Sequence, residues 1–427
     1  MDIILGGLSM SKDNSDFFKQ KNSWSLIKDR LLSGYLAPYM QKVLTTNKKI
    51  CYVDCFSGKG KFDDGQPGSP LIALKIRDDC LSKTKIKVNK QCAIDMTFIE
   101  LNYAPDLEIN LAQYDNYYGK PHIVSGKYEE KIVEILKDKR GQNVFLYIDP
   151  YGIKALDTGL FDQFQTMGFS TFEMLINFNT FGFFRDACRV MSVDYKHDDA
   201  LQGLDDLVEY DPSSVIGFDK PAEKLTSIAG GEYWKAIVQD YKAGCINGYQ
   251  AEQRFSTEYK QRLKQRYGYV LDMPIKLKSG SRPKYRMIHV SDHEDGCYLM
   301  AQNMQNRKDE LYTNIQSGGQ MSLFDFMDSI SQSVEGEWIR QEDIEKYVKD
   351  TVKKIDKELG ITKFLAAFVN EYGLICDFKR IQNILAEPEK KKEIVIERYP
   401  DKTEKGRVST FWEEKGEKRV IIRRLKE

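Results

Sequence analysis

An acid, an aromatic residue and two glycines stand at alternate positions in Asp54-Cys55-Phe56-Ser57-Gly58-Lys59-Gly60. The apolar run from Ile50 to Val53 before them predicts a strand. After them, Ser69-Pro70 predicts the start of a helix, with Ser69 as its cap. Glycines at such a turn let backbone approach a ligand closely, and the amide groups of the turn offer it hydrogen-bond donors. Strand, glycine turn and helix together predict a corner that binds a nucleotide-like cofactor.

Three classes of cofactor compete for this corner. A phosphate-binding loop of the Walker type needs Ser or Thr after Gly-Lys, and Gly58-Lys59-Gly60-Lys61 lacks that hydroxyl. A dinucleotide fingerprint needs a third glycine where this chain has Asp63. S-adenosylmethionine binders use Asp-x-Phe-x-Gly-x-Gly, so this cofactor fits best, with Asp54, Phe56, Gly58 and Gly60 as its contacts. A plain glycine turn between core elements is the alternative.

Further strands are predicted, several of them ending in acids. Glu100 ends the apolar run from Met96, where a carboxylate can accept ribose hydroxyls, and Leu101 is assigned to the same cofactor site. The next strands are predicted at 122–126, 143–148 and 172–179. Helical stretches between them predict a parallel sheet, whose carboxyl edge binds ligands. Asp54, Glu100 and Asp149 all fall at that edge.

The turn Asp149-Pro150-Tyr151-Gly152 is the second indication of chemistry. It resembles the Asp/Asn-Pro-Pro-Tyr/Phe turn of class I methyltransferases that modify nucleobase nitrogens, without the second proline. Asp-Pro-Phe-Gly of tRNA guanine-N2 dimethyltransferases is more similar. On this reading Asp149 accepts the protons of an amine and Tyr151 stacks on the base, and these two residues are the catalytic candidates. Ordinary turn chemistry is the alternative.

The chain also resembles a known family, the three-Cys-motif partner proteins (TcmP). The residues that carry the resemblance are Tyr52 to Gly60, Gly65-Gln66-Pro67-Gly68-Ser69-Pro70, Phe98-Ile99-Glu100, Asp149 to Gly152 and Leu175 to Phe178. The resemblance implies a Rossmann-like class I methyltransferase fold. It also implies a partner with a three-cysteine motif that looks like radical S-adenosylmethionine proteins. The turn Ser125-Gly126-Lys127 departs from the usual pattern, since it lacks the acid that often contacts adenine.

Turn signals divide the chain into two units. An α/β domain is predicted over residues 15–310, beginning with a helix at 15–47 and ending in an antiparallel hairpin formed by 269–278 and 284–291. Residues 183–245 form a helical insertion in it. A linker is predicted at 311–322, where Ser317-Gly318-Gly319 interrupts the pattern.

The second unit, residues 323–427, reads as winged-helix-like and α+β. Helices are predicted up to Leu385, followed by strands at 393–399, 407–413 and 418–425. In a winged helix, the hairpin contacts the phosphate backbone of nucleic acid. The candidates for DNA or RNA contact are Arg407, Lys418, Arg419, Arg423 and Arg424. Docking of a protein is the alternative, because acids and bases alternate along this segment.

Composition limits the remaining possibilities for the partners and the location of the protein. The 427 residues are 41% hydrophobic, with 64 basic and 64 acidic side chains, so no overall charge attracts the chain to nucleic acid or membrane. No apolar run is long enough to span a membrane, and residues 1–14 lack a signal pattern. A cytoplasmic protein is expected. The eight cysteines are expected to be reduced and mostly buried, and no metal site is expected.

Two functions from different classes remain open. In one, the protein is an S-adenosylmethionine-dependent methyltransferase that acts on a nucleobase together with its three-cysteine-motif partner. In the other, the same fold is a non-catalytic adaptor that binds this partner and nucleic acid.

Overall fold

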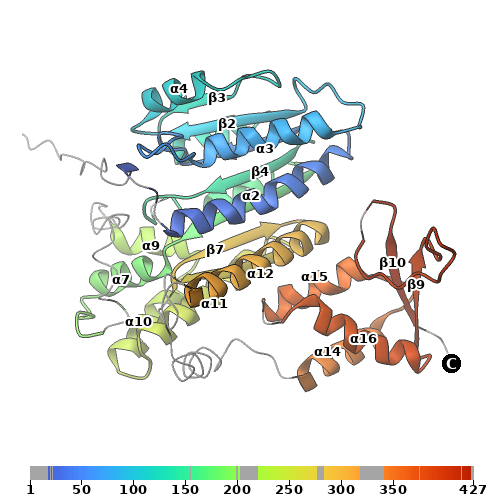
Figure 1. The fold of residues 1–427 in the computed structure, drawn as a ribbon. Coiled ribbons are helices and arrows are strands. Elements are labelled where there is room, and N and C mark those ends of the chain that lie inside the picture. The colour runs from blue at the N-terminus through green and yellow to red at the C-terminus, as the bar shows by residue number, and fades with distance from the viewer. Residues whose placement is uncertain are drawn as a thin grey trace, which may run out of the picture.

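A computed structural model describes residues 18–19, 21, 23–153, 155–198, 201, 220–276, 283–317, 341–374, 376–414 and 416–424. Its centre is a seven-stranded sheet in the order β3-β2-β1-β4-β5-β7-β6, shown in Figure 1. The strands are β1 (Ile50–Asp54), β2 (Ile94–Glu100), β3 (His122–Ser125), β4 (Asn143–Ile148), β5 (Thr171–Phe178), β6 (Tyr269–Lys276) and β7 (Pro283–Ser291).

The strands β1 to β5 are parallel, whereas β7 is antiparallel to β5 and to β6. The prediction of a Rossmann-like α/β sheet, with parallel strands and a terminal antiparallel hairpin, is therefore confirmed. The central strands β1 and β4 are buried along their whole length. Strands buried on both faces read as continuous apolar runs, which is how residues 50–53 and 144–148 could be recognised.

Helices cover both faces of the sheet. One core holds residues of α2 (Ser23–Leu44), α3 (Ser69–Lys83), α4 (Ala104–Ala112) and α12 (Glu294–Ser317). The other holds residues of α5 (Tyr128–Leu136), α6 (Thr158–Phe164), α7 (Thr180–Val190), α9 (Pro221–Ala229), α10 (Tyr233–Lys242) and α11 (Gly248–Lys264). Alternate residues of β1 enter opposite cores, since Tyr52 packs in the first and Val53 in the second. The helices α7, α9 and α10 lie in the predicted insertion between β5 and β6.

A cluster of buried charges fastens α11 to the hairpin. Arg286 on β7 contacts Glu252 of α11 at 2.6 Å and Asp272 of β6 at 2.5 Å. Lys260 of α11 contacts Asp272 at 2.6 Å. Burial would raise the pKa of Asp272, but Lys260 and Arg286 outweigh it and hold that pKa at about 2. Helix α11, which follows the insertion, is therefore attached to the sheet next to its carboxyl edge.

The start of α3 differs from expectation. Gly68, not Ser69, is the N-cap of α3, and no side chain caps the helix. The Gly68 N–H donates to the Gly60 carbonyl at 2.9 Å, and a Cβ on Gly68 would lie 3.0 Å from that oxygen. The close approach of two backbone segments requires glycine here, which leaves Ser69 as the first residue of the helix.

The carboxyl-terminal unit contains α14 (Gln341–Lys354), β8 (Leu359–Gly360), α15 (Ile361–Tyr372), α16 (Phe378–Lys390), β9 (Ile394–Tyr399) and β10 (Arg419–Arg424). Its three strands follow the order β8-β10-β9. The strand predicted at 407–413 is wrong: residues 402–408 turn back on themselves through a single bridge between Lys402 and Val408. Hydrogen bonds between Thr403 and Arg407 close this turn, so the segment has no partner strand.

The carboxyl-terminal unit packs directly on the large domain. Asn370 of α15 accepts the Val270 N–H at 2.9 Å and donates to the Gly268 carbonyl at 3.0 Å. Tyr298 of α12 stacks on Phe378 with ring centroids 4.9 Å apart. Apolar residues of α12, α14, α15 and β10 belong to one continuous core. Helix α12 also continues through 311–317, the first residues of the predicted linker, and residues 318–322 lie outside the described part.

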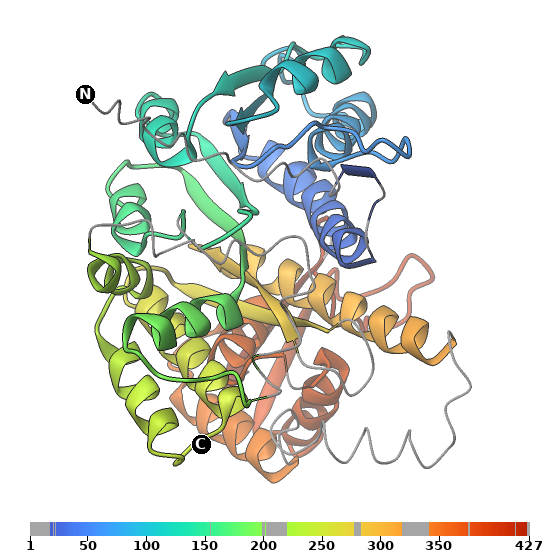
Figure 2. The same ribbon diagram turned by 90° about the vertical axis from the view of Figure 1, so that its left-hand side faces the viewer.

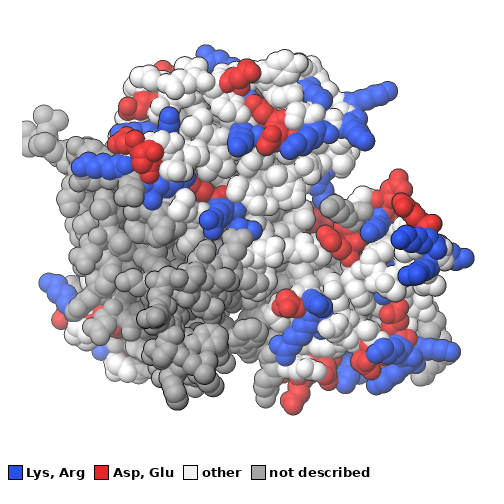
Figure 3. Space-filling view, in the orientation of Figure 1, with Lys and Arg blue, Asp and Glu red and all other residues white. Residues whose placement is uncertain are grey.

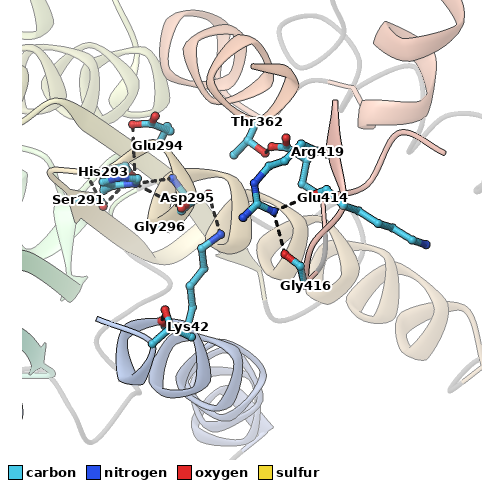
Figure 4. A network of polar contacts seen from close by, with 12 residues as sticks. Lys42, Ser291, His293, Glu294, Asp295, Gly296, Thr362, Glu414, Gly416 and Arg419 are labelled. Atoms are coloured by element: carbon cyan, nitrogen blue, oxygen red, sulfur yellow. Dashed lines mark hydrogen bonds and ion pairs between the residues drawn. The ribbon is translucent and has the colours of Figure 1, made fainter. Parts of the chain in front are cut away.

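This contact lies at the amino ends of the parallel strands. Tyr269 lies between the two residues that contact Asn370, and it pairs with Ser291 of β7. Ser291 in turn pairs with Glu173 near the start of β5. At the same edge, Lys42 near the end of α2 forms an ion pair with Asp295 at the start of α12, at 2.9 Å. Figure 4 shows this pair beside Thr362, Glu414 and Arg419 of the carboxyl-terminal unit.

Within the described residues, no helix is long and apolar enough to cross a membrane. All eight cysteines are free, and six of them are buried, as the sequence predicted. In the same part of the chain, no three His, Cys, Asp or Glu side chains form a group that could hold a metal ion.

Candidate functional site

The carboxyl ends of the parallel strands face the viewer in Figure 2. A cleft lies at these ends of the strands. It contains about 730 Å³ of space, including the part open to solvent. Residues of α2, the glycine loop, the turn after β4, the start of α7 and β7 line it. Phe56, Gly58, Gly60, Asp149 and Tyr151 are among them, whereas Asp54, Glu100 and Leu101 are not.

The glycine loop after β1 needs its glycines for conformation and for space. Gly58 and Gly60 have φ values of +58° and +76°, a region that side chains disfavour. A Cβ on Gly60 would lie 2.7 Å from a methyl carbon of Leu107 on α4, and one on Gly58 would lie 3.2 Å from the Phe18 ring. The loop is therefore held tightly between α4 and the segment that precedes α2.

Phe18 covers the loop on the cleft side. Its ring contacts Tyr103 edge-on with centroids 5.0 Å apart, and the Lys59 ammonium lies 5.0 Å from its centroid. The Phe18 carbonyl accepts the Asp63 N–H at 2.8 Å. Lys21 next to it pairs with Asp29 of α2. Aromatic and cationic groups from three segments thus meet over the glycine loop.

Asp54 ends β1 beneath this loop and is fully buried. Its Oδ1 accepts the Phe56 N–H at 3.2 Å, while its Oδ2 is buried with no hydrogen-bond partner among the described residues. Burial raises the pKa of this carboxyl to about 7, against the lowering effect of the Ser69 hydroxyl and the Phe56 N–H. An unpartnered buried carboxylate oxygen is costly, and a cationic ligand would compensate for it.

Glu100 ends β2 and binds backbone. Its Oε2 accepts the Gly58 N–H at 2.7 Å, and its Oε1 accepts those of Asn102 at 2.9 Å and Tyr103 at 3.2 Å. Three of the about four acceptor positions of this carboxylate are therefore taken by backbone, and Glu100 is buried outside the lining of the cleft. The carboxylate therefore anchors the glycine loop to the turn after β2. Leu101 follows it with 51% of its surface exposed.

Asp149 directly follows β4 and accepts three hydrogen bonds, and the Lys28 ammonium also pairs with its second oxygen. The Lys28 ammonium lies 3.0 Å from Oδ1 and 2.9 Å from Oδ2. Asn177 of β5 donates to Oδ1 at 2.7 Å, and the Tyr147 hydroxyl donates to Oδ2 at 3.2 Å. The ion pair is mostly buried, with 7% of the Lys28 side chain and 19% of the Asp149 side chain exposed.

Aromatic side chains surround this ion pair. The Tyr285 ring of β7 lies 5.7 Å from the Lys28 ammonium. The Tyr151 hydroxyl comes within 4.0 Å of the place a Gly58 Cβ would take, so the turn after β4 meets the glycine loop. Tyr147, Tyr151 and Tyr285 all line the cleft. A flat, polar ligand is the kind that such walls suit.

Lys28 is directed into the cleft by the packing of α2. Tyr35, seven residues later and therefore on the same face of the helix, donates a hydrogen bond to the buried Glu173 of β5. His289 of β7 lies 3.0 Å from the same Glu173 oxygen. This buried contact holds α2 against β5 and β7, so Lys28 approaches Asp149 from a rigid element.

The sequence reasoning did not identify Lys28, Asn177 or Tyr285. Asn177 carried a usable signal, because a polar residue near the end of an otherwise apolar strand indicates the ligand edge of the sheet. Lys28 carried none, since one lysine among the charged residues of a helix has no distinguishing spacing. Tyr285 stands in a strand whose register was unknown.

The basic residues predicted to contact nucleic acid lie far from the cleft, on the carboxyl-terminal unit. Arg423 pairs with Glu358 at 2.9 Å and Glu397 at 3.1 Å. Arg424 donates to the Lys353 carbonyl at 3.1 Å.

The other three basic residues, Arg407, Lys418 and Arg419, lie in or directly after the segment from 400 to 418. Arg419 folds back onto the Gly416 carbonyl at 2.8 Å (Figure 4). Lys418 lies over the Phe411 ring at 4.9 Å, and Arg407 is exposed in the turn at 402–408. Figure 3 shows Lys and Arg interspersed with Asp and Glu on this face of the molecule.

No family model and no curated protein matches the chain. Among solved structures, it is similar to the plantazolicin methyltransferase BamL in complex with a triazolic desmethylPZN analog and SAH. That likeness has 9% sequence identity and a TM-score of 0.29, and it covers 65% of this chain and 90% of the other.

Proposed function

We propose that this protein is an S-adenosylmethionine-dependent methyltransferase that acts on the amino group of a nucleobase. It would work together with a three-cysteine-motif partner, as the resemblance to the TcmP family implies. The observation that carries the proposal is the meeting of two loops in one cleft: the glycine loop after β1 and the Asp-Pro-Tyr-Gly turn after β4.

The residues around the glycine loop fit this cofactor. Asp54 offers a buried carboxylate oxygen with no partner among the described residues, suited to the cationic amino-acid end of the cofactor. Gly58 and Gly60 shape the loop, because a Cβ on either would press against Phe18 or Leu107. Glu100 is proposed to accept ribose hydroxyls, and Phe56 and Leu101 offer apolar contact. When bound, S-adenosylmethionine supplies an activated methyl group.

Asp149 and Tyr151 are proposed to position the acceptor. The Asp149 carboxylate orients an amine through its N–H groups, and the Tyr151 ring supports the base by stacking. Alignment of the two reacting groups then contributes most of the rate, as expected when one of them is already activated.

For the carboxyl-terminal unit, we propose a winged helix that binds DNA or RNA. Helix, strand, two helices and two strands follow one another in α14, β8, α15, α16, β9 and β10. Its proposed phosphate contacts are Arg407 and Lys418. The other candidates already bind within the protein: Arg419 to the Gly416 carbonyl, Arg423 to Glu358 and Glu397, and Arg424 to the Lys353 carbonyl. Docking of the partner protein on the same unit is the competing assignment.

Calorimetry followed by a methyl-transfer assay tests the proposal. S-adenosylhomocysteine should bind the purified chain at about micromolar affinity, whereas ATP and NAD should not bind. With labelled S-adenosylmethionine and the partner present, wild-type protein should label RNA or DNA. Asp149→Asn preserves the shape of the side chain and should abolish labelling while leaving S-adenosylhomocysteine affinity unchanged.

Asp157→Asn is the matched control. Asp157 accepts the Gly159 N–H at the start of α6, and it is not among the residues that line the cleft. This variant should label nucleic acid like wild type. Full labelling by Asp149→Asn would contradict the role of Asp149.

One observation favours a second function, the non-catalytic adaptor. Both oxygens of Asp149 already bind groups of the protein, through three hydrogen bonds and the ion pair with Lys28, as in a structural ion pair. If S-adenosylhomocysteine binds but neither nucleic acid nor the partner becomes labelled, the adaptor is the better assignment.

A further inference from the structure

The hydrogen bonds of Asp149 limit how the amino group of a methyl acceptor could bind to its carboxylate. A carboxylate offers about four acceptor positions. Lys28 and Asn177 donate to Oδ1, Tyr147 donates to Oδ2, and the Lys28 ammonium also lies 2.9 Å from Oδ2 as an ion pair. Both oxygens are thus in contact with donors of the protein, so a ligand N–H binds Asp149 most directly by replacing one of them.

Lys28 is the donor best able to leave. Asn177 and Tyr147 belong to the central strands β5 and β4, whose backbone holds their side chains in place. Lys28 reaches the carboxylate at the end of a flexible four-carbon stem. Its ammonium also stands at the edge of the open cleft, which Lys28 itself lines.

We propose that the acceptor side of the cleft is an amine-binding site, that the Lys28 ammonium is its resident occupant, and that an amine ligand binds by displacing Lys28. The site consists of the Asp149 carboxylate and the Tyr285 ring. These are the two groups that bind an ammonium or amino group, through charge-assisted hydrogen bonds and through cation–π attraction.

The surroundings of Lys28 support an exchange of one nitrogen for another. Asp29, on the same helix and also lining the cleft, adds a second carboxylate to this region. A neutral apolar group in place of the ammonium would leave Asp149 mostly buried without its counter-ion, which is costly. The site therefore selects ligands that present N–H groups. Lys28 restrains binding of weaker ligands by competing with them.

The inference rests on the proposed function for the identity of the ligand as methyl acceptor. It can nevertheless be tested without any methyl transfer. Lys28→Ala vacates the site, and ethylammonium is the probe that replaces the missing end of the side chain. The melting temperature of the variant should fall below that of wild type. Saturating ethylammonium should then raise it by about 1 to 3 °C, the shift expected from weak binding to the folded state.

Three controls define the result. Wild-type protein should not respond, because its own ammonium fills the site. Lys61→Ala, which removes an exposed lysine that also lines the cleft, should not respond either. Tetramethylammonium carries the same charge without an N–H, and it should leave Lys28→Ala unchanged.

Equal responses of the three proteins, or of the two cations, would overturn the proposal. Should Lys28→Ala fail to fold, Lys28→Met retains the stem, and ammonium ion replaces ethylammonium as the probe with the same controls. S-adenosylhomocysteine binding by wild type is measured in parallel. Its absence would refute the proposed function, whereas binding without amine rescue would refute only the inference drawn here.

Discussion

The proposed contact between Asp54 and the cationic end of the cofactor predicts a pH dependence of binding. Burial raises the pKa of the Asp54 carboxyl to about 7, so the free protein holds this proton below pH 7. A cation beside Oδ2 requires the ionised carboxylate. S-adenosylhomocysteine affinity should therefore weaken about tenfold for each pH unit below 7. Calorimetry between pH 5 and 8 measures this dependence.

Asp54→Asn is the matched variant, because it preserves shape and removes the titration. Its affinity should be lower at pH 8 and flat across the same range. If wild type and variant share one pH profile, Asp54 is not the group that binds the cation.

The same pKa gives a stability effect whose sign can be worked out. Between the unfolded pKa of 3.8 and the folded value of about 7, the folded state binds the proton that the unfolded state has released. Stability of the free protein therefore falls as pH rises through this window and levels off above it. The full pKa difference, from 3.8 to about 7, corresponds to about 4 kcal/mol.

Among the elements, the glycine loop allows the energetic cost of backbone strain to be measured separately from the cost of steric overlap. Gly60 and Gly65 both have positive φ, of +76° and +84°, but only Gly60 has a neighbour, Leu107, against which a Cβ would press. Gly65→Ala should cost about 1 to 2 kcal/mol of unfolding free energy through backbone strain alone. Gly60→Ala should cost at least about 1 kcal/mol more, from overpacking.

Urea unfolding measures both variants, and calorimetry measures their binding of S-adenosylhomocysteine. Gly60→Ala should lose binding, while Gly65→Ala should retain it. Loss of binding in both would mean that the whole loop, rather than its approach to α4, determines the site.

The elements also show what could be read from sequence. Continuous apolar runs identified β1 and β4, and the acids at their ends marked the cleft side, because both signals are local. The strand predicted at 407–413 failed because a strand needs a partner, and alternation alone does not reveal one. Lys28 and Asp149 are 121 residues apart, so only the packing of α2 on the sheet brings them together.

At the scale of the whole molecule, the two units share one core. The sequence suggested a linker and two separable units, but α12 belongs to the large domain and also packs on α15 through contacts such as Cys297 to Ala366. Removal of the carboxyl-terminal unit would expose this apolar surface. Single substitutions are therefore the better way to test its function.

Salt dependence distinguishes the basic residues of this unit. Arg407→Gln and Lys418→Gln should each reduce the slope of log affinity against log salt by about 1 if each residue contacts one phosphate. Arg423→Gln should leave the slope unchanged, since Glu358 and Glu397 already pair with that guanidinium. Affinity for a short duplex at several salt concentrations gives the three slopes.

An unchanged slope in the first two variants would favour the docking of a protein on this unit. A reduced slope in Arg423→Gln would show that nucleic acid displaces its two carboxylates.

The attachment of the carboxyl-terminal unit at the amino ends of the strands sets a minimum length for any substrate held at both places. The cleft lies at the other ends, and a six-residue strand such as β4 spans about 20 Å. A double helix advances 3.4 Å per base pair, so at least about six base pairs separate the two contacts. Shorter fragments would contact the cleft or the carboxyl-terminal unit but not both. The distance between the two sites would then set the shortest substrate that the protein binds at both.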